Sequence, residues 1–419
     1  MAPEVRSTRL ENGLRVVSES VRDVPSVSLG VWLETGSRHE GQSTNGLCHF
    51  LEHLFFKGTE KRTPRQIAEE IEGVGGTIDA FTDKEQTCFL TRTLAEHLEL
   101  SVDVLADLLL NSTFLPEDIE LEREVIIHEI QDAEAIPEDY IYDFYLHSWW
   151  PGHPLGLPVA GTVASVAAIS RDEILAQARK AVRSDHIVVS AAGAVDHEQL
   201  VDWCREKFAG LVPAVTESET DRPDYNPGVF VCERELDQAH LLLGLPGISV
   251  TDPRYAAAEV LVSALGGGMS SRLFQSVREE RGKAYSVYAF LSPYRDIGYT
   301  GIYAATGGGD VEEVLDLVFK ELKAIKQQGL DPGELARTRE QIAGACLLSL
   351  ESMESRMGRI ARNQLYFGRE IAVEEVVAEV RAVSNQQVME IALDILSTDR
   401  AGLALVGDAG VGTVSLPLA

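Results

Sequence analysis

The chain of 419 residues is 45% hydrophobic and 25% charged, which is typical of a globular protein with two or three domains. Its net charge of −29 argues against a nucleic-acid partner, because polyphosphate would be repelled. The charge is compatible with attraction of basic peptides, and an acidic surface that serves only solubility is the alternative interpretation. The N-terminal residues lack the apolar core of a signal peptide, and there is no run of about 18 apolar residues, so we expect a cytoplasmic protein without a membrane span.

The first half of the chain begins with strands and continues with helices. Alternating apolar and polar residues predict strands over 14–21 and 27–33, and a helix that carries His49 follows. Thr63 at the N-cap, with Pro64 and Gln66 after it, predicts the start of the next helix. We expect the remaining elements of this half to be strands over 77–81 and 87–92, helices over 94–110, 116–133 and 172–182, and a strand over 186–192.

The second half repeats this order. The motif Leu115-Pro-Glu-Asp recurs about 216 positions later around Leu330. The sequence therefore predicts an α+β fold of two homologous domains, 1–212 and 228–419, joined by an exposed linker over 213–227. Each domain would pack helices on one face of a mostly antiparallel sheet. We expect the second half to contain strands over 229–233, 241–245, 285–290 and 402–406, and helices over 255–265, 311–328, 332–350 and 384–396.

The segment His49-Phe50-Leu51-Glu52-His53 carries the pattern H-x-x-E-H. On a helix of about 3.6 residues per turn, the two histidines and the glutamate project from one face. Two imidazoles one turn apart can hold a zinc ion, and the carboxylate can act as a base toward an attacking water, as in an inverzincin. An amphipathic helix with chance polar residues is the alternative interpretation.

The two halves differ in the residues that could bind metal. All ten histidines lie at or before position 240, so the second half cannot repeat the H-x-x-E-H pattern. A third ligand is expected on the helix 116–133, where Glu122 and Glu129 lie two turns apart on one face. The aligned residues of the second half are Thr338 and Ala345, so this acidic pair is also missing there. A solvated acidic helix is the alternative interpretation.

The pattern His49-x-x-Glu52-His53, with Glu129 lying 76 residues after His53, resembles the pitrilysin-type M16 metallopeptidases. The resemblance points to the branch that contains the mitochondrial processing peptidase β subunit and its bacterial homologues, and it covers nearly the whole chain. It implies one zinc ion per chain, held by His49, His53 and Glu129, with Glu52 as the general base. It also implies that Glu122 supports activity without binding the metal, and that two bowl-like halves close as a clamshell around a chamber.

Two further segments resemble motifs of this family. Arg278 and Tyr285 match its R-x6-Y pair, which reaches the substrate carbonyl from the second domain, and both side chains are suitable donors to an oxyanion. A surface arginine and a core tyrosine are the alternative. The segment 76–82 resembles the edge strand that accepts a peptide as an added β-strand, although an ordinary sheet strand is equally compatible. Many relatives have asparagine at position 79, so side-chain preference is open there; the candidate substrate-binding residues are Asp79, Ala80, Phe81 and Thr82.

Three functions are compatible with these observations. The leading hypothesis is a zinc endopeptidase that hydrolyses unfolded or extended peptides inside a closed chamber. The alternatives are a non-catalytic M16-like binding or assembly subunit, and a specialised maturase of one peptide-derived product. The zinc ligands and the Arg278–Tyr285 pair occur in one chain, which favours a self-sufficient enzyme and is compatible with a homodimer.

Overall fold

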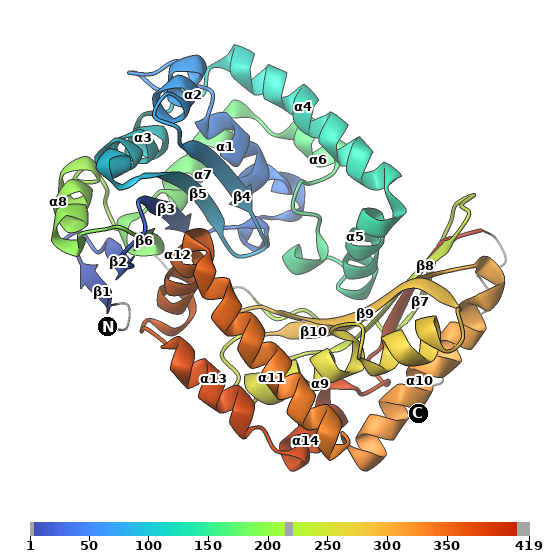
Figure 1. Cartoon of the computed structure of the whole chain (residues 1–419). Coiled ribbons are helices and arrows are strands. Elements are labelled where there is room, and N and C mark those ends of the chain that lie inside the picture. Colours follow the sequence, from blue (N-terminus) through green and yellow to red (C-terminus); the bar gives the residue numbers. More distant parts are fainter. Residues whose placement is uncertain (1–3, 214–220, 409–419) are drawn as a thin grey trace. The chain divides into compact units, whose positions relative to one another are not determined.

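The computed structural model describes residues 4–213 and 221–408, so positions 214–220 of the expected linker lie outside the described residues. The chain forms two compact units, each with one β-sheet and helices packed on it (Figure 1). The predicted two-domain α+β class is therefore confirmed. Unit 1 comes from Met1–Asp132, Leu157–Asp221 and Ser349–Ile371, and unit 2 comes from Ala133–Gly156, Arg222–Leu348 and Ala372–Ala419.

The sheet of unit 1 has six strands: β1 (Glu4–Arg9), β2 (Arg15–Ser20), β3 (Ser26–Leu33), β4 (Thr77–Thr82), β5 (Thr87–Leu94) and β6 (Ile187–Gly193). Their order in space is β1-β2-β6-β3-β5-β4. β2 and β6 run parallel, and the other neighbouring pairs are antiparallel. β4 lies at one edge and, within the described residues, pairs only with β5.

The helices of unit 1 are α1 (Leu47–Phe55), α2 (Pro64–Glu72), α3 (Leu98–Asn111), α4 (Pro116–Ala135), α6 (Val163–Ala168), α7 (Arg171–Ala181), α8 (His197–Lys207) and α12 (Met353–Arg362). α2 begins as predicted, because the Thr63 hydroxyl accepts a hydrogen bond from the Gln66 amide and Pro64 occupies the first turn. α1 and α2 pack on β4, α3 packs on β3 and β5, and α8 packs on β2.

Both faces of this sheet are buried. On β3, Val27, Leu29 and Val31 join the larger apolar core, whereas Trp32 joins a smaller core on the opposite face. α12 packs on β2, β3 and β6 and contributes Met357 to that smaller core. Helices therefore cover both faces of the sheet rather than the single face that the sequence predicted, which explains why β3 reads as a nearly continuous apolar run.

Unit 2 repeats the sheet topology of unit 1. Its strands are β7 (Gly228–Glu233), β8 (Ala239–Pro246), β9 (Ala284–Pro293), β10 (Gly298–Thr306) and β11 (Gly402–Gly407). Their order is β7-β11-β8-β10-β9, with β7 and β11 parallel and the other pairs antiparallel. Without β1, the sheet of unit 1 has the order β2-β6-β3-β5-β4, which matches β7-β11-β8-β10-β9 strand by strand, including the single parallel pair. The two units therefore share one topology, as the repeated order of elements in the sequence predicted.

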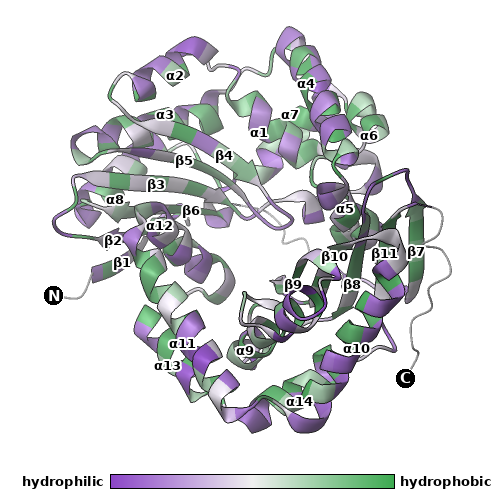
Figure 2. Cartoon of the chain, turned by 45° about the vertical axis from the view of Figure 1, so that its right-hand side comes forward, coloured by the Kyte–Doolittle hydropathy of each residue, from purple (hydrophilic) through white to green (hydrophobic). Residues whose placement is uncertain are grey.

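The helices of unit 2 are α5 (Pro137–Trp149), α9 (Tyr255–Gly266), α10 (Val311–Gln328), α11 (Pro332–Leu348), α13 (Val373–Ala382) and α14 (Asn385–Ile395). Leu241 and Leu243 of β8 join one core, and Leu242 joins another with Tyr145 and Trp149 of α5. Figure 2 shows hydrophobic residues along β7 and β8, whereas α4 of unit 1 carries many hydrophilic residues. Among the described residues, no helix has both the length and the apolar character of a membrane span.

The two units exchange helices between the halves of the chain. α5 follows α4 in the first half but packs on β8 and β11 of unit 2, and α12 follows α11 in the second half but packs in unit 1. A glycine makes each approach possible. A Cβ on Gly30 of β3 would lie 2.5 Å from Met357 Sδ, and a Cβ on Gly244 of β8 would lie 1.6 Å from Tyr145 Oη. β3 and β8 occupy equivalent positions in the two sheets, and in each a glycine leaves room for a side chain of the helix that comes from the other half of the chain.

Candidate metal centre

The helix α1 is held in place by its apolar side. Phe50, Leu51 and Leu54 are buried in the core of unit 1, whereas His49, Glu52 and His53 are only partly buried. Gly46 is the N-cap residue just before α1, and its φ of 92° is in the left-handed region. A Cβ there would lie 2.6 Å from the Ala160 carbonyl oxygen, so glycine is required by both conformation and space.

Glu40 provides the cap that a glycine cannot provide. Its Oε2 accepts a hydrogen bond from the Gly46 amide at 2.8 Å, and its Oε1 accepts one from the Cys48 amide at 2.6 Å. A carboxylate is stabilised at this end of a helix, where unpaired N–H groups meet the positive end of the dipole. Burial raises the pKa of the Glu40 carboxyl, although the two amides oppose this shift. Glu40 therefore fixes the start of α1 at Leu47, two residues before His49.

Three side chains of unit 1 converge at one point. Glu129 Oε2 lies 3.9 Å from His49 Nε2 and 3.6 Å from His53 Nε2, and the three candidate ligand atoms lie within 4.8 Å of one another. Tetrahedral zinc with bonds of about 2.0–2.2 Å separates its ligand atoms by roughly 3.3–3.6 Å. Two imidazoles and one carboxylate in this arrangement fit the donor set of a zinc site that keeps a fourth position open.

The protonation state of His49 suits metal binding. Burial lowers its pKa to about 4, and the neighbouring His53 adds to the shift, so the imidazole is neutral at neutral pH. Neutral imidazole has a free lone pair for a cation. The Nδ1 atom of His49 is buried and has no hydrogen-bond partner among the described residues.

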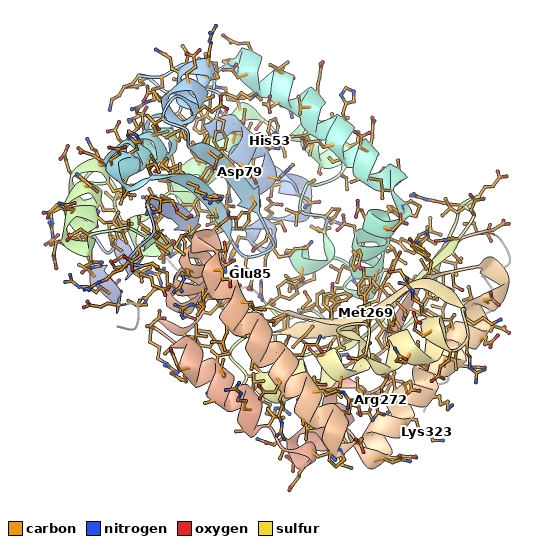
Figure 3. The ribbon with its side chains drawn as sticks, in the orientation of Figure 1. His53, Asp79, Glu85, Met269, Arg272 and Lys323 are labelled. Carbon is orange, nitrogen blue, oxygen red and sulfur yellow. The ribbon has the colours of Figure 1, made fainter. Side chains whose placement is uncertain are left out.

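His53 has a partner on each side of its ring. Nδ1 lies 3.0 Å from Glu122 Oε2, while Nε2 faces Glu129. Lys57 Nζ lies 2.5 Å from the other oxygen of Glu122, which is almost fully buried. The lysine pairs with the carboxylate, and the carboxylate in turn favours the tautomer of His53 with a proton on Nδ1. Figure 3 shows His53 on α1 in unit 1.

Glu52 faces the edge of the sheet. The Thr82 hydroxyl donates a hydrogen bond to Glu52 Oε2 at 2.5 Å. Burial raises the pKa of the Glu52 carboxyl, and the Thr82 hydrogen bond opposes that shift. Raised basicity is what a general base requires, because its proton affinity then approaches that of its target.

The predicted substrate strand is β4, the edge strand of the sheet. Thr77, Asp79 and Phe81 are exposed, while Ile78, Ala80 and Thr82 are half-buried. Its unpaired edge could accept another strand. Phe81 lies against Trp32 with ring centroids 5.5 Å apart, so this exposed ring is held in place.

The remaining two predicted residues lie in unit 2. Arg278 belongs to a π-helical segment, Phe274–Glu279, and Tyr285 lies on β9 with 74% of its surface exposed. The Arg278 guanidinium carbon lies 5.5 Å from the centroid of the Tyr285 ring, so the two side chains are neighbours. Their reach toward the His49–His53–Glu129 cluster stays a prediction.

Sequence reasoning missed Glu40 and Lys57, which hold the site from outside the H-x-x-E-H pattern. Lys57 lies four residues after His53, a spacing that could have suggested it. Glu40 lies in an irregular segment six residues before Gly46, and nothing in the local sequence links it to α1.

Comparisons with known proteins agree on one family. Residues 15–163 match the family described as "Insulinase (Peptidase family M16)", and residues 168–342 match "Peptidase M16 inactive domain". An uncharacterized zinc protease of Streptomyces coelicolor is 40% identical over 411 residues, covering 96% of this chain and 89% of the relative. One of Bacillus subtilis is 37% identical over 401 residues, covering 96% and 97%.

A solved structure has the same fold. The structure described as the peptidase M16 inactive domain from Pseudomonas fluorescens superposes with a TM-score of 0.90 at 21% identity, covering 97% of this chain and 98% of that chain. A protease from Helicobacter pylori gives a TM-score of 0.89 at 18% identity, covering 96% and 99%. At such low identity these two similarities concern the fold alone.

Proposed function

This chain belongs to peptidase family M16, and we propose that it is a zinc-dependent endopeptidase that hydrolyses unfolded or extended peptides. The observation that carries the proposal is the convergence of His49 Nε2, His53 Nε2 and Glu129 Oε2, with Glu52 on the same helix as the histidines. One zinc ion per chain would be held by these three ligands. Zinc proteases among the relatives support the choice of metal.

The residues around the cluster divide the chemistry between them. Zinc in this site would polarise the peptide carbonyl and lower the pKa of a water molecule. Glu52 takes the proton of the attacking water and passes it to the leaving amine, and its half-buried position keeps it basic. Glu122, paired with Lys57, holds the ring of His53 in its binding orientation.

The substrate would add to β4 as an extra strand along Asp79, Ala80, Phe81 and Thr82. Such a mode recognises main-chain groups and therefore requires an extended, unfolded peptide. The net charge of −29 would favour basic peptides. On this proposal the protein acts in the cytoplasm on peptides, without nucleic acid or membrane, and is compatible with a homodimer.

Arg278 and Tyr285 are proposed to donate hydrogen bonds to the oxyanion of the tetrahedral intermediate. Their proximity to each other, and the exposure of Tyr285, leave both donors available. This role requires the two halves, 1–212 and 228–419, to close as a clamshell around the peptide, with the linker 213–227 as the connection.

A Glu52→Gln variant tests the proposal most directly. Glutamine cannot accept the proton, so we expect zinc content near one per chain and cleavage of a peptide library slower by about 10²–10⁴-fold. Glu60→Gln, an exposed residue beyond α1, is the matched control. Metal analysis and mass spectrometry of the products provide the two measurements. More than half of the wild-type rate in Glu52→Gln would show that another group is the base.

A non-catalytic assembly subunit is the second candidate function. It is favoured by the match of residues 168–342 to the family described as an inactive domain. Wild-type protein that holds zinc but cleaves no member of the library would support this candidate. A specialised maturase uses the same chemistry and would cleave one sequence class alone.

A further inference from the structure

The edge strand β4 presents a specific set of main-chain groups. Asp79 is paired with Leu90, Phe81 with Cys88 and Ala80 with Phe89 in the antiparallel register with β5. The amide of Ala95, one residue after β5, donates a hydrogen bond to the carbonyl of Pro25, one residue before β3. Because Ala95 therefore pairs with β3, odd-numbered residues of β5 direct their main-chain groups toward β3. Even-numbered residues of β5, among them Leu90, direct theirs toward β4.

It follows which groups of β4 face the open edge. Asp79 and Phe81 exchange main-chain hydrogen bonds with β5, because their partners are the even-numbered residues. Ile78, Ala80 and Thr82 therefore direct their N–H and C=O groups away from the sheet. An added peptide strand would use these groups, and the Ala80 pair is at the centre.

The central donor is already occupied. The Ala80 amide donates a hydrogen bond to its own neighbour, Asp79 Oδ1, at 2.8 Å. A hydrogen bond to an ionised carboxylate is roughly twice as strong as one to a neutral carbonyl, which is what a peptide would offer. Figure 3 shows Asp79 on this strand.

We propose that Asp79 is a removable cap on the substrate edge, whose carboxylate must leave the Ala80 amide before a peptide strand can pair there. This inference rests on the proposed peptidase function and adds a specificity-determining residue to it. The cap protects the edge of β4 from non-specific pairing with strands of other chains, which leads to aggregation at an open sheet edge. It admits only peptides whose remaining contacts outweigh the lost hydrogen bond.

Hydrogen exchange tests the cap without any peptide. The exchange rate of the Ala80 amide, corrected for the rate in unfolded peptides of each sequence, should rise roughly tenfold in Asp79→Ala, the change expected for about one hydrogen bond. Glu72→Ala removes an exposed charge at the end of α2 and is the matched control. Equal protection of Ala80 in wild type and Asp79→Ala would overturn the proposal.

Peptide binding tests the gating role. In the Glu52→Gln background, the Kd of a fluorescein-labelled peptide chosen from the cleaved library should fall roughly tenfold with Asp79→Ala. Asp79→Asn should lie between the two, because its amide oxygen accepts without a charge. Weaker or unchanged binding in Asp79→Ala would make Asp79 a substrate contact or a bystander and overturn the proposal. If the wild-type protein cleaves no peptide, both the peptidase function and the gating role are refuted. The hydrogen-exchange experiment needs no peptide, so it tests only whether Asp79 caps the Ala80 amide.

Discussion

His53 is held between two carboxylates, with Nδ1 3.0 Å from Glu122 Oε2 and Nε2 3.6 Å from Glu129 Oε2. Glu122 is almost fully buried and Glu129 is about half exposed. The two glutamates lie on one helix, seven residues apart, yet they have different tasks. The buried one orients the ring, and the exposed one is available to a metal.

Glu122→Gln should weaken zinc binding without removing it. The amide loses the charge that pairs with Lys57 and holds the ring of His53, and changes of this kind lower metal affinity about 10–100-fold. Competition with a chelator measures the shift, and Glu124→Gln, exposed on the same helix, is the control. If the competition curve of Glu122→Gln equals that of the wild type, Glu122 does not support zinc binding.

Thr82→Val should move the acid limb of kcat/KM to higher pH. The hydroxyl hydrogen bond favours the ionised carboxylate and lowers the pKa of Glu52, so its loss raises that pKa. The base acts only when it is ionised. A higher pKa of Glu52 therefore means that, as the pH is lowered, activity begins to fall at a higher pH than in the wild type. Thr82→Ser keeps the hydroxyl and should keep the wild-type profile. An acid limb that moves to lower pH in the valine variant contradicts the assignment.

Glu40→Gln should destabilise α1 and the metal site together. The side-chain amide has one oxygen in place of two, so either the Gly46 or the Cys48 amide loses its acceptor in a buried place. A buried donor without a partner costs about 1–3 kcal/mol. Urea unfolding of the zinc-free protein should show the loss, and Glu60→Gln should not. Equal stability of the two variants would mean that solvent replaces the cap.

Tyr285→Phe should slow turnover and leave zinc binding unchanged. Removal of one oxyanion donor costs on the order of 10²-fold in kcat, because the donor acts in the transition state rather than on the bound substrate. Arg278→Lys should act in the same direction, and Arg281→Lys, a neighbouring exposed arginine, is the control. A change in KM alone would assign the pair to peptide binding.

A fragment of residues 1–212 should fold poorly by itself. It lacks α12, which covers Trp32, Val17 and Val188 on the second face of the sheet. Fusing residues 349–371 to the fragment should restore a cooperative thermal transition and reduce binding of a hydrophobic dye. If the fragment alone melts cooperatively and binds no dye, α12 is dispensable for unit 1.

Most local elements were predictable because their signals are local. The strands β2 and β3, the helices α1, α2 and α10 and the duplication follow from period, caps and repeated motifs. α5 and α12 were missed, because each packs on a sheet formed by distant parts of the chain. β10 was missed as well; it is buried on both faces and includes Gly301, which lies against the Phe290 ring, so it shows no alternation.

The candidate site shows the same division. His49, Glu52 and His53 are recognisable because one helix turn brings them together. Glu122 and Glu129 stand out as a pair because the second half lacks their counterparts, and the resemblance to the M16 family selects Glu129 as the ligand. Glu40 is recognisable only in the fold, since it acts from an irregular segment. Lys57 acts through Glu122, and its only signal in the sequence is its position four residues after His53. The main-chain direction of Ala80 depends on the register of β4 with β5, which composition does not reveal.

Because α12 belongs to unit 1 but lies late in the chain, unit 1 cannot complete its folding until most of the chain has been synthesised. A ribosome that has released residues up to 221 has produced all strands of unit 1, but α12 belongs to the next 150 residues, 222 to 371. At usual synthesis rates of about 5–20 residues per second, one face of that sheet stays open for roughly 8–30 s. During this part of translation the apolar face around Trp32 is not covered by α12. A chaperone that binds apolar strands could therefore bind the nascent chain there.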